Sequence, residues 1–155
     1  MRDLPRRPVI ISFDDGYASF ADIGVPELVS RNMTASVFVV ANASVQTNSW
    51  DADCGRPRHR LMDDTATRAV MRAGMEIGAH GWNHLDLRSC SDEDAFQEIA
   101  GARQELSRRF GIHPSVFAYP FGRYREEHFA LLANACYSGA VSIFSDRPTE
   151  VAPVV

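Results

Sequence analysis

The sequence predicts a single α/β domain with parallel strands, and three observations support this prediction. Short apolar, β-branched runs alternate with helical stretches along the chain, which is typical of parallel strands covered by helices. The 155 residues are enough for one domain with a core and too few for two typical domains. Hydrophobic residues make up 45% and charged residues 23%, as in ordinary globular proteins. From these features alone, the sheet could be a barrel or a doubly wound sheet.

The first half of the chain is expected to run from strand to helix, to a second strand and then to a loop. Residues 9–13 form an apolar run that ends abruptly at Asp14-Asp15-Gly16, which is typical of a buried strand ending in a turn. We expect a helix at residues 25–31 and a buried strand at residues 35–40. Residues 41–60 are rich in Asn, Ser, Asp, Pro and Gly, which predicts a long loop, and such loops are often functional.

The second half repeats this alternation with clearer helix ends. A helix is expected to start at Asp63-Asp64-Thr65 and to end at Gly74. Ser91 and Asp94 resemble a capping box that opens a long amphipathic helix, with Gly111 as its end. The other predicted elements are strands at 76–79, 116–119 and 139–143, a helix at 126–135, and a terminal loop at 148–155.

Charge and hydropathy argue against two classes of function. The net charge of −4 and the pI near 5.7 argue against nucleic-acid binding, which needs a basic face. No apolar run approaches the roughly 20 residues that span a bilayer. Without a signal peptide, the chain as written is expected to be cytoplasmic, or extracytoplasmic if it is cut from a longer precursor. Cys54, Cys90 and Cys136 are widely spaced, so they are expected to be unpaired thiols.

Three groups of reactive residues fall at the carboxyl ends of predicted strands. They are Asp14-Asp15, the pair His80 and His84, and the turn Tyr119-Pro120-Phe121-Gly122. Taken singly, an Asp-Asp-Gly is usually a turn, and two histidines four apart are more often surface or core than metal ligands. The carboxyl ends of parallel strands share one face, however, and two imidazoles with a carboxylate suit zinc, iron or a similar divalent ion. Such a set leaves positions open for water and substrate, as a catalytic metal requires.

The adjacent carboxylates allow a division of roles. One can bind the metal, while the other acts as general base on water whose pKa the ion lowers toward about 7. Successive side chains on a strand point to opposite sides, so the two roles require a bend, which Gly16 permits.

The same residues resemble the motifs of a known family. Ile-Ser-Phe-Asp14-Asp15-Gly16-Tyr17, Glu76-Ile-Gly78-Ala-His80-Gly-Trp-Asn-His84 and Phe117-Ala-Tyr119-Pro120-Phe121-Gly122 resemble, in order and spacing, those of the polysaccharide deacetylase family. This family is also called carbohydrate esterase family 4, and its fold is the NodB-homology domain. The resemblance covers about residues 8–142. It implies an α/β fold that is a distorted (β/α) barrel, in a single domain at residues 1–155 that is truncated at its C-terminal end.

The resemblance implies an activity and a metal centre. The expected reaction is the metal-dependent hydrolysis of an N-acetyl or other acyl group from a carbohydrate, such as a polymer that contains N-acetylglucosamine. Asp14 would be the general base. Asp15, His80 and His84 would hold one divalent ion, with zinc the first choice and cobalt, nickel or iron as alternatives.

The third motif and one tryptophan would contact the substrate. The backbone N–H of Phe121 corresponds to the family's oxyanion donor. Tyr119, Pro120 and Gly122 would form a wall of the groove. Trp82 lies between the two histidines and is expected to face either the sugar or the core. The loop around Trp50 is expected either to border the groove or to be solvated.

Two departures from the family pattern concern the proton transfers. Many relatives have an arginine that orients the base at the position of Ala118 here. The family's general acid is a histidine in a Leu-x-His motif near the C-terminal end, and after Phe121 the only histidine is His128, in a predicted helix. The general acid is therefore unassigned, and the simplest account is that the chain ends before it.

Other functions are compatible with parts of the sequence. A carbohydrate-binding module that keeps the groove without turnover would explain both departures. An aspartyl-phosphate phosphohydrolase would explain Phe-Asp-Asp-Gly, but that chemistry uses carboxylates two positions apart and leaves the two histidines unexplained. A purely structural zinc site is disfavoured, because such sites usually have four Cys or His ligands.

Overall fold

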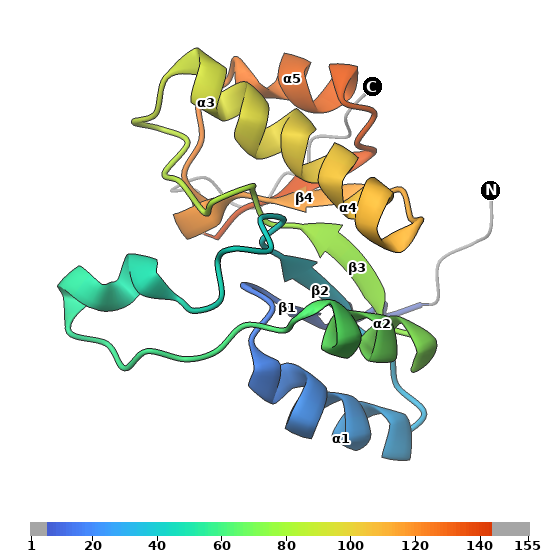
Figure 1. Cartoon of the computed structure of the whole chain (residues 1–155). Coiled ribbons are helices and arrows are strands. Elements are labelled where there is room, and N and C mark those ends of the chain that lie inside the picture. The colour runs from blue at the N-terminus through green and yellow to red at the C-terminus, as the bar shows by residue number, and fades with distance from the viewer. Residues whose placement is uncertain (1–5, 144–155) are drawn as a thin grey trace.

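The computed structural model describes residues 6–143, apart from the side chains of residues 53 and 54, and its strands form one parallel sheet. The five strands follow their order in the chain (Figure 1): β1 (Ser12–Phe13), β2 (Ser36–Val39), β3 (Glu76–Ala79), β4 (Val116–Ala118) and β5 (Gly139–Val141). This sequential order confirms the barrel-type sheet and excludes a doubly wound sheet, whose strand order reverses. Within the described residues the sheet is open, with β1 and β5 at its edges, so it forms half of a barrel.

Helices connect successive strands, as the alternation in the sequence predicts. The α-helices are α1 (Val25–Ser30), α2 (Asp64–Arg72), α3 (Asp92–Phe96), α4 (Ala102–Phe110) and α5 (His128–Asn134). A π-helix, η1 (Phe20–Gly24), leads into α1, and a second, η3 (Gln97–Gly101), joins α3 to α4. Two 3-10 helices, η2 (Ser49–Cys54) and η4 (Pro120–Gly122), complete the set. Figure 1 shows α1 and α2 beside the β1 end of the sheet, and α3, α4 and α5 beside the β4 end.

Local side-chain chemistry sets the helix ends that the sequence predicts. The Asp63 side chain accepts a hydrogen bond from the Ala66 N–H at the start of α2, and the Ser91 hydroxyl accepts one from the Asp94 N–H at the start of α3. Gly111 ends α4 with a left-handed φ of +69°. The predicted helix up to residue 110 therefore exists, but η3 interrupts its α-helical pattern.

The core lies between the sheet and its helices. Val37, Ile77 and Phe117 are buried on the three central strands, and Ile99, Leu106 and Leu132 cover them from the helices. Because parallel strands are buried in this way, they read in sequence as continuous apolar runs.

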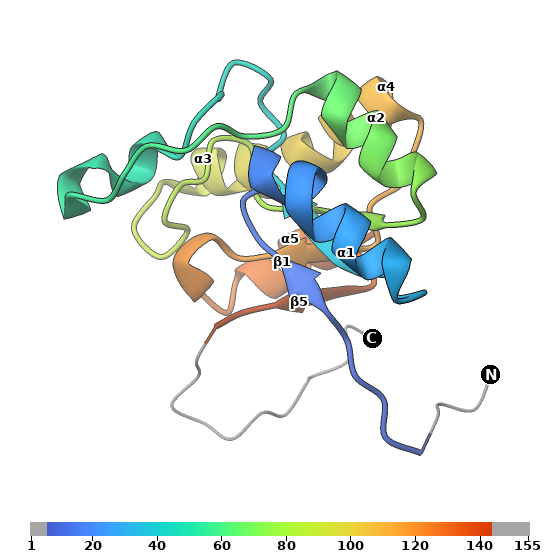
Figure 2. The same cartoon turned by 90° about the horizontal axis from the view of Figure 1, so that it is seen from below.

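The predicted strand at residues 9–13 is wrong in its first half. Val9 and Ile10 are 85% and 86% exposed, and β1 contains only Ser12 and Phe13. Because β1 is an edge strand, it pairs only with β2, and the segment before it leads away from the sheet (Figure 2). The apolar composition of Val9 and Ile10 does not predict their exposure, because an edge strand is buried only where another strand or helix packs against it, and none of the described residues does so here.

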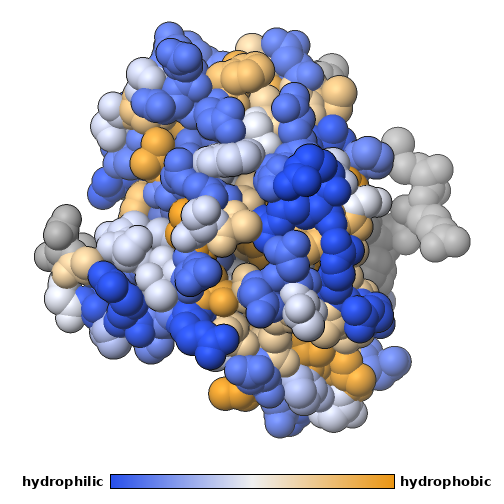
Figure 3. Space-filling model, viewed as in Figure 1, coloured by the Kyte–Doolittle hydropathy of each residue, from blue (hydrophilic) through white to orange (hydrophobic). Residues whose placement is uncertain are grey.

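The surface is mainly polar on the face that Figure 3 shows, with hydrophobic residues gathered along its lower edge over α1. Ile23 and Val29 are exposed in this region of the chain. No helix within residues 6–143 is long and apolar enough to span a bilayer. Cys90 and Cys136 are free thiols, while the Cys54 side chain and the predicted loop at 148–155 lie outside the described residues.

Candidate metal centre

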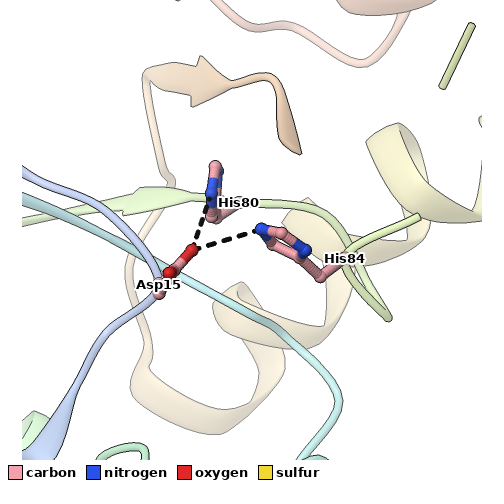
Figure 4. A group of neighbouring side chains, drawn as sticks. All are labelled: Asp15, His80 and His84. Carbon is pink, nitrogen blue, oxygen red and sulfur yellow. Dashed lines mark ion pairs between the residues drawn. The ribbon is translucent and has the colours of Figure 1, made fainter. Parts of the chain in front are cut away.

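The three side chains predicted to bind a metal lie together at the carboxyl end of the sheet. Asp15 follows β1, and His80 and His84 follow β3. The Asp15 Oδ1 atom lies 3.1 Å from His80 Nε2 and 3.2 Å from His84 Nε2, as the dashed lines in Figure 4 mark. One potential ligand atom from each residue lies within 4.8 Å of the other two. This arrangement can surround one small cation.

Backbone turns in the left-handed region aim these side chains. Asp15 has a φ of +68° and Gly16 a φ of +73°, so the chain reverses directly after β1. A Cβ atom at Gly16 would lie 2.9 Å from Val39 Cγ1, which leaves glycine as the residue that fits there. His84 has a φ of +64°, another conformation that non-glycine residues adopt at a cost of about 1–3 kcal/mol. Such strain often marks functional positions.

The hydrogen bond of His80 fits a bound cation. Its Nδ1 lies 2.9 Å from the Ala118 carbonyl oxygen, which can only accept, so Nδ1 carries the proton in the neutral ring. The lone pair of Nε2 then faces the Asp15 carboxylate across 3.1 Å. Two electron-rich atoms at this distance are stabilised by a positive ion between them. The donor set of one carboxylate and two imidazoles suits zinc, cobalt, nickel or iron.

The surroundings favour an anionic Asp15 and a neutral His84. Burial tends to raise the pKa of Asp15, but the imidazoles of His80 and His84, when they are protonated, hold that pKa well below its ordinary value by hydrogen bonding and charge. Burial lowers the pKa of His84, against the opposing effect of Asp15. These are the protonation states that metal ligation requires.

Two aromatic rings pack against His84. The Trp50 ring stacks on the imidazole at a centroid distance of 3.9 Å and an interplanar angle of 20°. The Phe121 ring meets it edge-on at 4.6 Å. The His84 Nδ1 atom is buried and has no hydrogen-bond partner among the described residues, so packing and the backbone hold this ring. Trp82 instead is half-buried and packs against the core.

The third motif forms a tight turn with one exposed member. Phe121 is 39% exposed and has a φ of +58°, and a Cβ atom at Gly122 would lie 2.5 Å from the Ile143 carbonyl oxygen. Tyr119 is only 4% exposed, and its ring stacks on Tyr124. Pro120 and Gly122 are buried as well. Only Phe121 of this turn presents its side chain at the surface.

The two adjacent carboxylates have different surroundings. Asp14 is exposed, and its side chain makes no hydrogen bond or ion pair with another described residue, whereas Asp15 is half-buried in the cluster. Tyr17, at the end of the same motif, is also half-buried, and burial together with the neighbouring Asp15 carboxylate raises its pKa. His128 is 1% exposed and accepts a hydrogen bond at Nδ1 from the Arg125 N–H, so it lies in the interior and not at the centre.

The long loop between β2 and α2 borders two hollows beside the centre. One, of about 290 Å³, is lined by Asp15, Asn42 and Arg60 among others. The other, of about 370 Å³, is lined by Tyr17, Asn48, Asp51, Arg56, Pro57, His59 and Ser19. The loop therefore contributes Trp50 and polar side chains to the surroundings of the cluster.

Comparison with protein families gives one match that covers most of the chain. The family model described as polysaccharide deacetylase matches residues 1–140. Two curated relatives are similar at low identity. The chain is 25% identical to YxkH of Bacillus subtilis (strain 168) over 119 residues, which are 77% of this chain and 38% of that protein. It is 21% identical to the peptidoglycan-N-acetylglucosamine deacetylase PgdA of Listeria monocytogenes over 114 residues, which are 74% of this chain and 21% of PgdA.

Solved structures share the fold. The deacetylase PplD of Streptococcus pyogenes, in complex with acetate, aligns with a TM-score of 0.76 at 21% identity, over 90% of this chain and 57% of that one. The chain thus spans well under half of the two curated relatives and somewhat over half of this structure.

Proposed function

Because this chain belongs to the polysaccharide deacetylase family, we propose that it is a metal-dependent hydrolase that removes an N-acetyl or similar acyl group from a carbohydrate. A polymer that contains N-acetylglucosamine is the proposed substrate, on the analogy of the name of PgdA. The observation that carries the proposal is the cluster of Asp15, His80 and His84 at the carboxyl ends of parallel strands. Their donor set fits one divalent ion, with zinc first, and a coordinated zinc ion would polarise the acyl carbonyl and acidify water.

The two carboxylates would divide the remaining work. Asp15 is engaged by both imidazoles, and its lowered pKa keeps it an anionic ligand. Asp14 has an exposed carboxylate with no partner among the described residues, so it is free to take the proton from the attacking water as general base.

The turn after β4 and the long loop would frame the reacting group. The Phe121 N–H would donate a hydrogen bond to the carbonyl oxygen as negative charge develops on it. The rings of Trp50 and Phe121, which both contact His84, would limit the access of bulk water. His128 is buried, so another group must protonate the leaving amine.

The first experiment tests the metal centre. After dialysis against micromolar zinc, elemental analysis should find about one equivalent of zinc per chain in the wild type. His80→Ala should retain little or no zinc. His113→Ala removes an exposed histidine and should keep the full equivalent. A wild type without metal, or a His80→Ala protein that keeps it, contradicts the proposal.

The second experiment tests the base and separates the proposal from its alternative. Acetate release from N-acetylglucosamine oligomers should fall about 100-fold or more in Asp14→Asn, while zinc content stays at the wild-type level. The alternative is a catalytically inactive carbohydrate-binding module, which Ala118 favours. A wild type that binds zinc and oligomers but releases no acetate would support this module instead.

A further inference from the structure

A buried carboxylate lies directly behind the segment that carries His84. Glu98, on η3, is 1% exposed, and it forms no ion pair with a basic side chain among residues 6–143. Burial raises its pKa, against the opposing effect of nearby backbone N–H groups. Carboxylates are rarely buried without a cation unless several hydrogen bonds compensate. The hydrogen bonds of Glu98 therefore indicate its role.

Both oxygens of Glu98 bind the backbone on either side of the second histidine. Oε1 accepts from the Asn83 N–H at 2.6 Å, and Oε2 accepts from the Leu85 N–H at 3.1 Å. We call residues 81–85 the His84 loop. Backbone N–H groups of one turn that converge on one anion form a concave binding site, which fixes the backbone that surrounds the anion.

The opposite side of the His84 loop is tied to the chain that follows β2. The Ala41 N–H donates to the Gly81 carbonyl at 2.9 Å, and the Asn42 N–H donates to the Trp82 carbonyl at 3.0 Å. The carbonyl groups at the start of the loop are thus bound by backbone, while two of its N–H groups depend on one side chain. Glu98 therefore supplies the hydrogen-bond acceptors that these N–H groups do not find on a neighbouring strand.

Steric contacts around Glu98 leave the loop little freedom. A Cβ atom at Gly81, where φ is +81°, would lie 2.4 Å from Glu98 Oε2. His84 itself is held at a φ of +64°. Glu98 lies within the π-helical turn η3, and such turns are frequent at functional sites.

We propose that Glu98 is the positioning residue of the metal centre, and that its carboxylate holds the His84 loop in the conformation that directs His84 Nε2 toward Asp15. This inference rests on the proposed function, because it assigns Glu98 a role toward the ion that Asp15, His80 and His84 would bind. Glu98 does not touch the ion or the substrate. It acts through the backbone, as the hydrogen-bond partners that surround metal ligands commonly do.

The test compares two Glu→Gln variants along the same helical segment. In Glu98→Gln, one oxygen becomes an NH₂ group that faces a backbone N–H, so one of the two hydrogen bonds is lost. We expect the affinity for Co²⁺ to fall about 10- to 100-fold, and the visible spectrum of the Co²⁺-saturated protein to change. Glu105→Gln removes a partner of Arg108 only, and it should keep the wild-type affinity and spectrum.

Two outcomes separate this inference from the proposed function. If the wild type binds no Co²⁺, both are overturned. If Glu98→Gln binds Co²⁺ with wild-type affinity and spectrum, only the role of Glu98 is overturned, even if its free energy of unfolding in EDTA is lower. A purely structural residue would lower stability without moving the spectrum.

A measurement on the wild type keeps the inference testable if Glu98→Gln does not fold. In the metal-free protein, the amide protons of Asn83 and Leu85 should be protected from hydrogen exchange, because Glu98 binds them in the absence of any ion. Protection of both amides supports the proposal. Free exchange of both, while those of Ala41 and Asn42 are protected, would contradict it.

Discussion

The histidines and the carboxylates of the candidate metal centre come from regions of opposite character. His80 and His84 follow a central strand, are 2% and 5% exposed, and have the Ala118 carbonyl and Glu98 behind them. Asp14 and Asp15 follow an edge strand of only two residues, and the chain before that strand is exposed. The orientation of the two imidazoles is thus set in the interior, while the proposed base lies where water and substrate can reach it.

The difference has a physical cause in the sheet. A central parallel strand is covered on both faces and paired on both sides, so residues after it can be held by several neighbours at once. An edge strand within the described residues has one partner, and a turn at its end depends on its own backbone conformation. Changes on the histidine side should therefore affect metal binding and folding together, and changes on the open side should separate them.

The largest effect is expected from crowding on the histidine side. Gly81→Ala forces a Cβ against Glu98 at a φ of +81°, whereas Gly111→Ala, at a φ of +69°, meets nothing within 4 Å. The left-handed conformation alone should cost about 1–2 kcal/mol in Gly111→Ala, and overpacking should add about 1–3 kcal/mol in Gly81→Ala. Urea unfolding in EDTA measures both. If both variants lost the same free energy of unfolding, the backbone around Gly81 would be able to shift, and the histidine side would not be the more rigid region.

A smaller effect is expected on the loop side, from Trp50→Ala. Loss of a stacked ring worth about 0.5–1.5 kcal/mol should weaken Co²⁺ binding by about 2- to 12-fold. Stability in EDTA should hardly change, because Trp50 lies on the long loop. Trp82→Ala should lower both the free energy of unfolding and the metal affinity, because Trp82 packs on the core from within the His84 loop. If calorimetry and unfolding gave the same pattern for both variants, loop and interior would not differ as described.

The smallest effect concerns pH and the interior behind Tyr119. Burial, with a contribution from Arg125, lowers the pKa of His128. The unfolded chain, with a histidine pKa near 6.5, then binds a proton that the folded state resists, so stability is present above about pH 6.5 and falls as the pH drops below it. One proton gives a slope of at most about 1.4 kcal/mol per pH unit. His128→Gln should reduce the slope between pH 6.5 and 5.5 in urea titrations, and an unchanged slope would assign it to other groups.

The sequence predicts the parts of the site that depend on local patterns. Apolar runs followed by Asp15 and by His80 place these residues at strand ends, and parallel pairing then brings them together whatever the details of the helices. Capping residues such as Asp63 act within three positions, so they are visible in one sequence.

Contacts that depend on the path of the chain could not be predicted. Both tryptophans were candidates, but only the course of the 41–60 loop brings Trp50 rather than Trp82 onto His84. The role of Glu98 depends on a turn 15 residues away in sequence. One sequence feature could have identified Glu98. It lies on the same helix face as Ala95, Ala102 and Leu106, and a glutamate on such a buried, apolar face usually has a specific hydrogen-bonding role.

The left-handed backbone at Asp15, His84 and Phe121 limits how this site can change over evolutionary time. Asp and His are among the few residues, with Asn and Gly, that tolerate this conformation, while β-branched residues do not. At positions 15 and 84, Asn, Asp, His and Gly are therefore the substitutions with the lowest backbone cost, and all but Gly carry an oxygen or nitrogen donor. The backbone thus favours residue types at these two positions that can also serve as metal ligands.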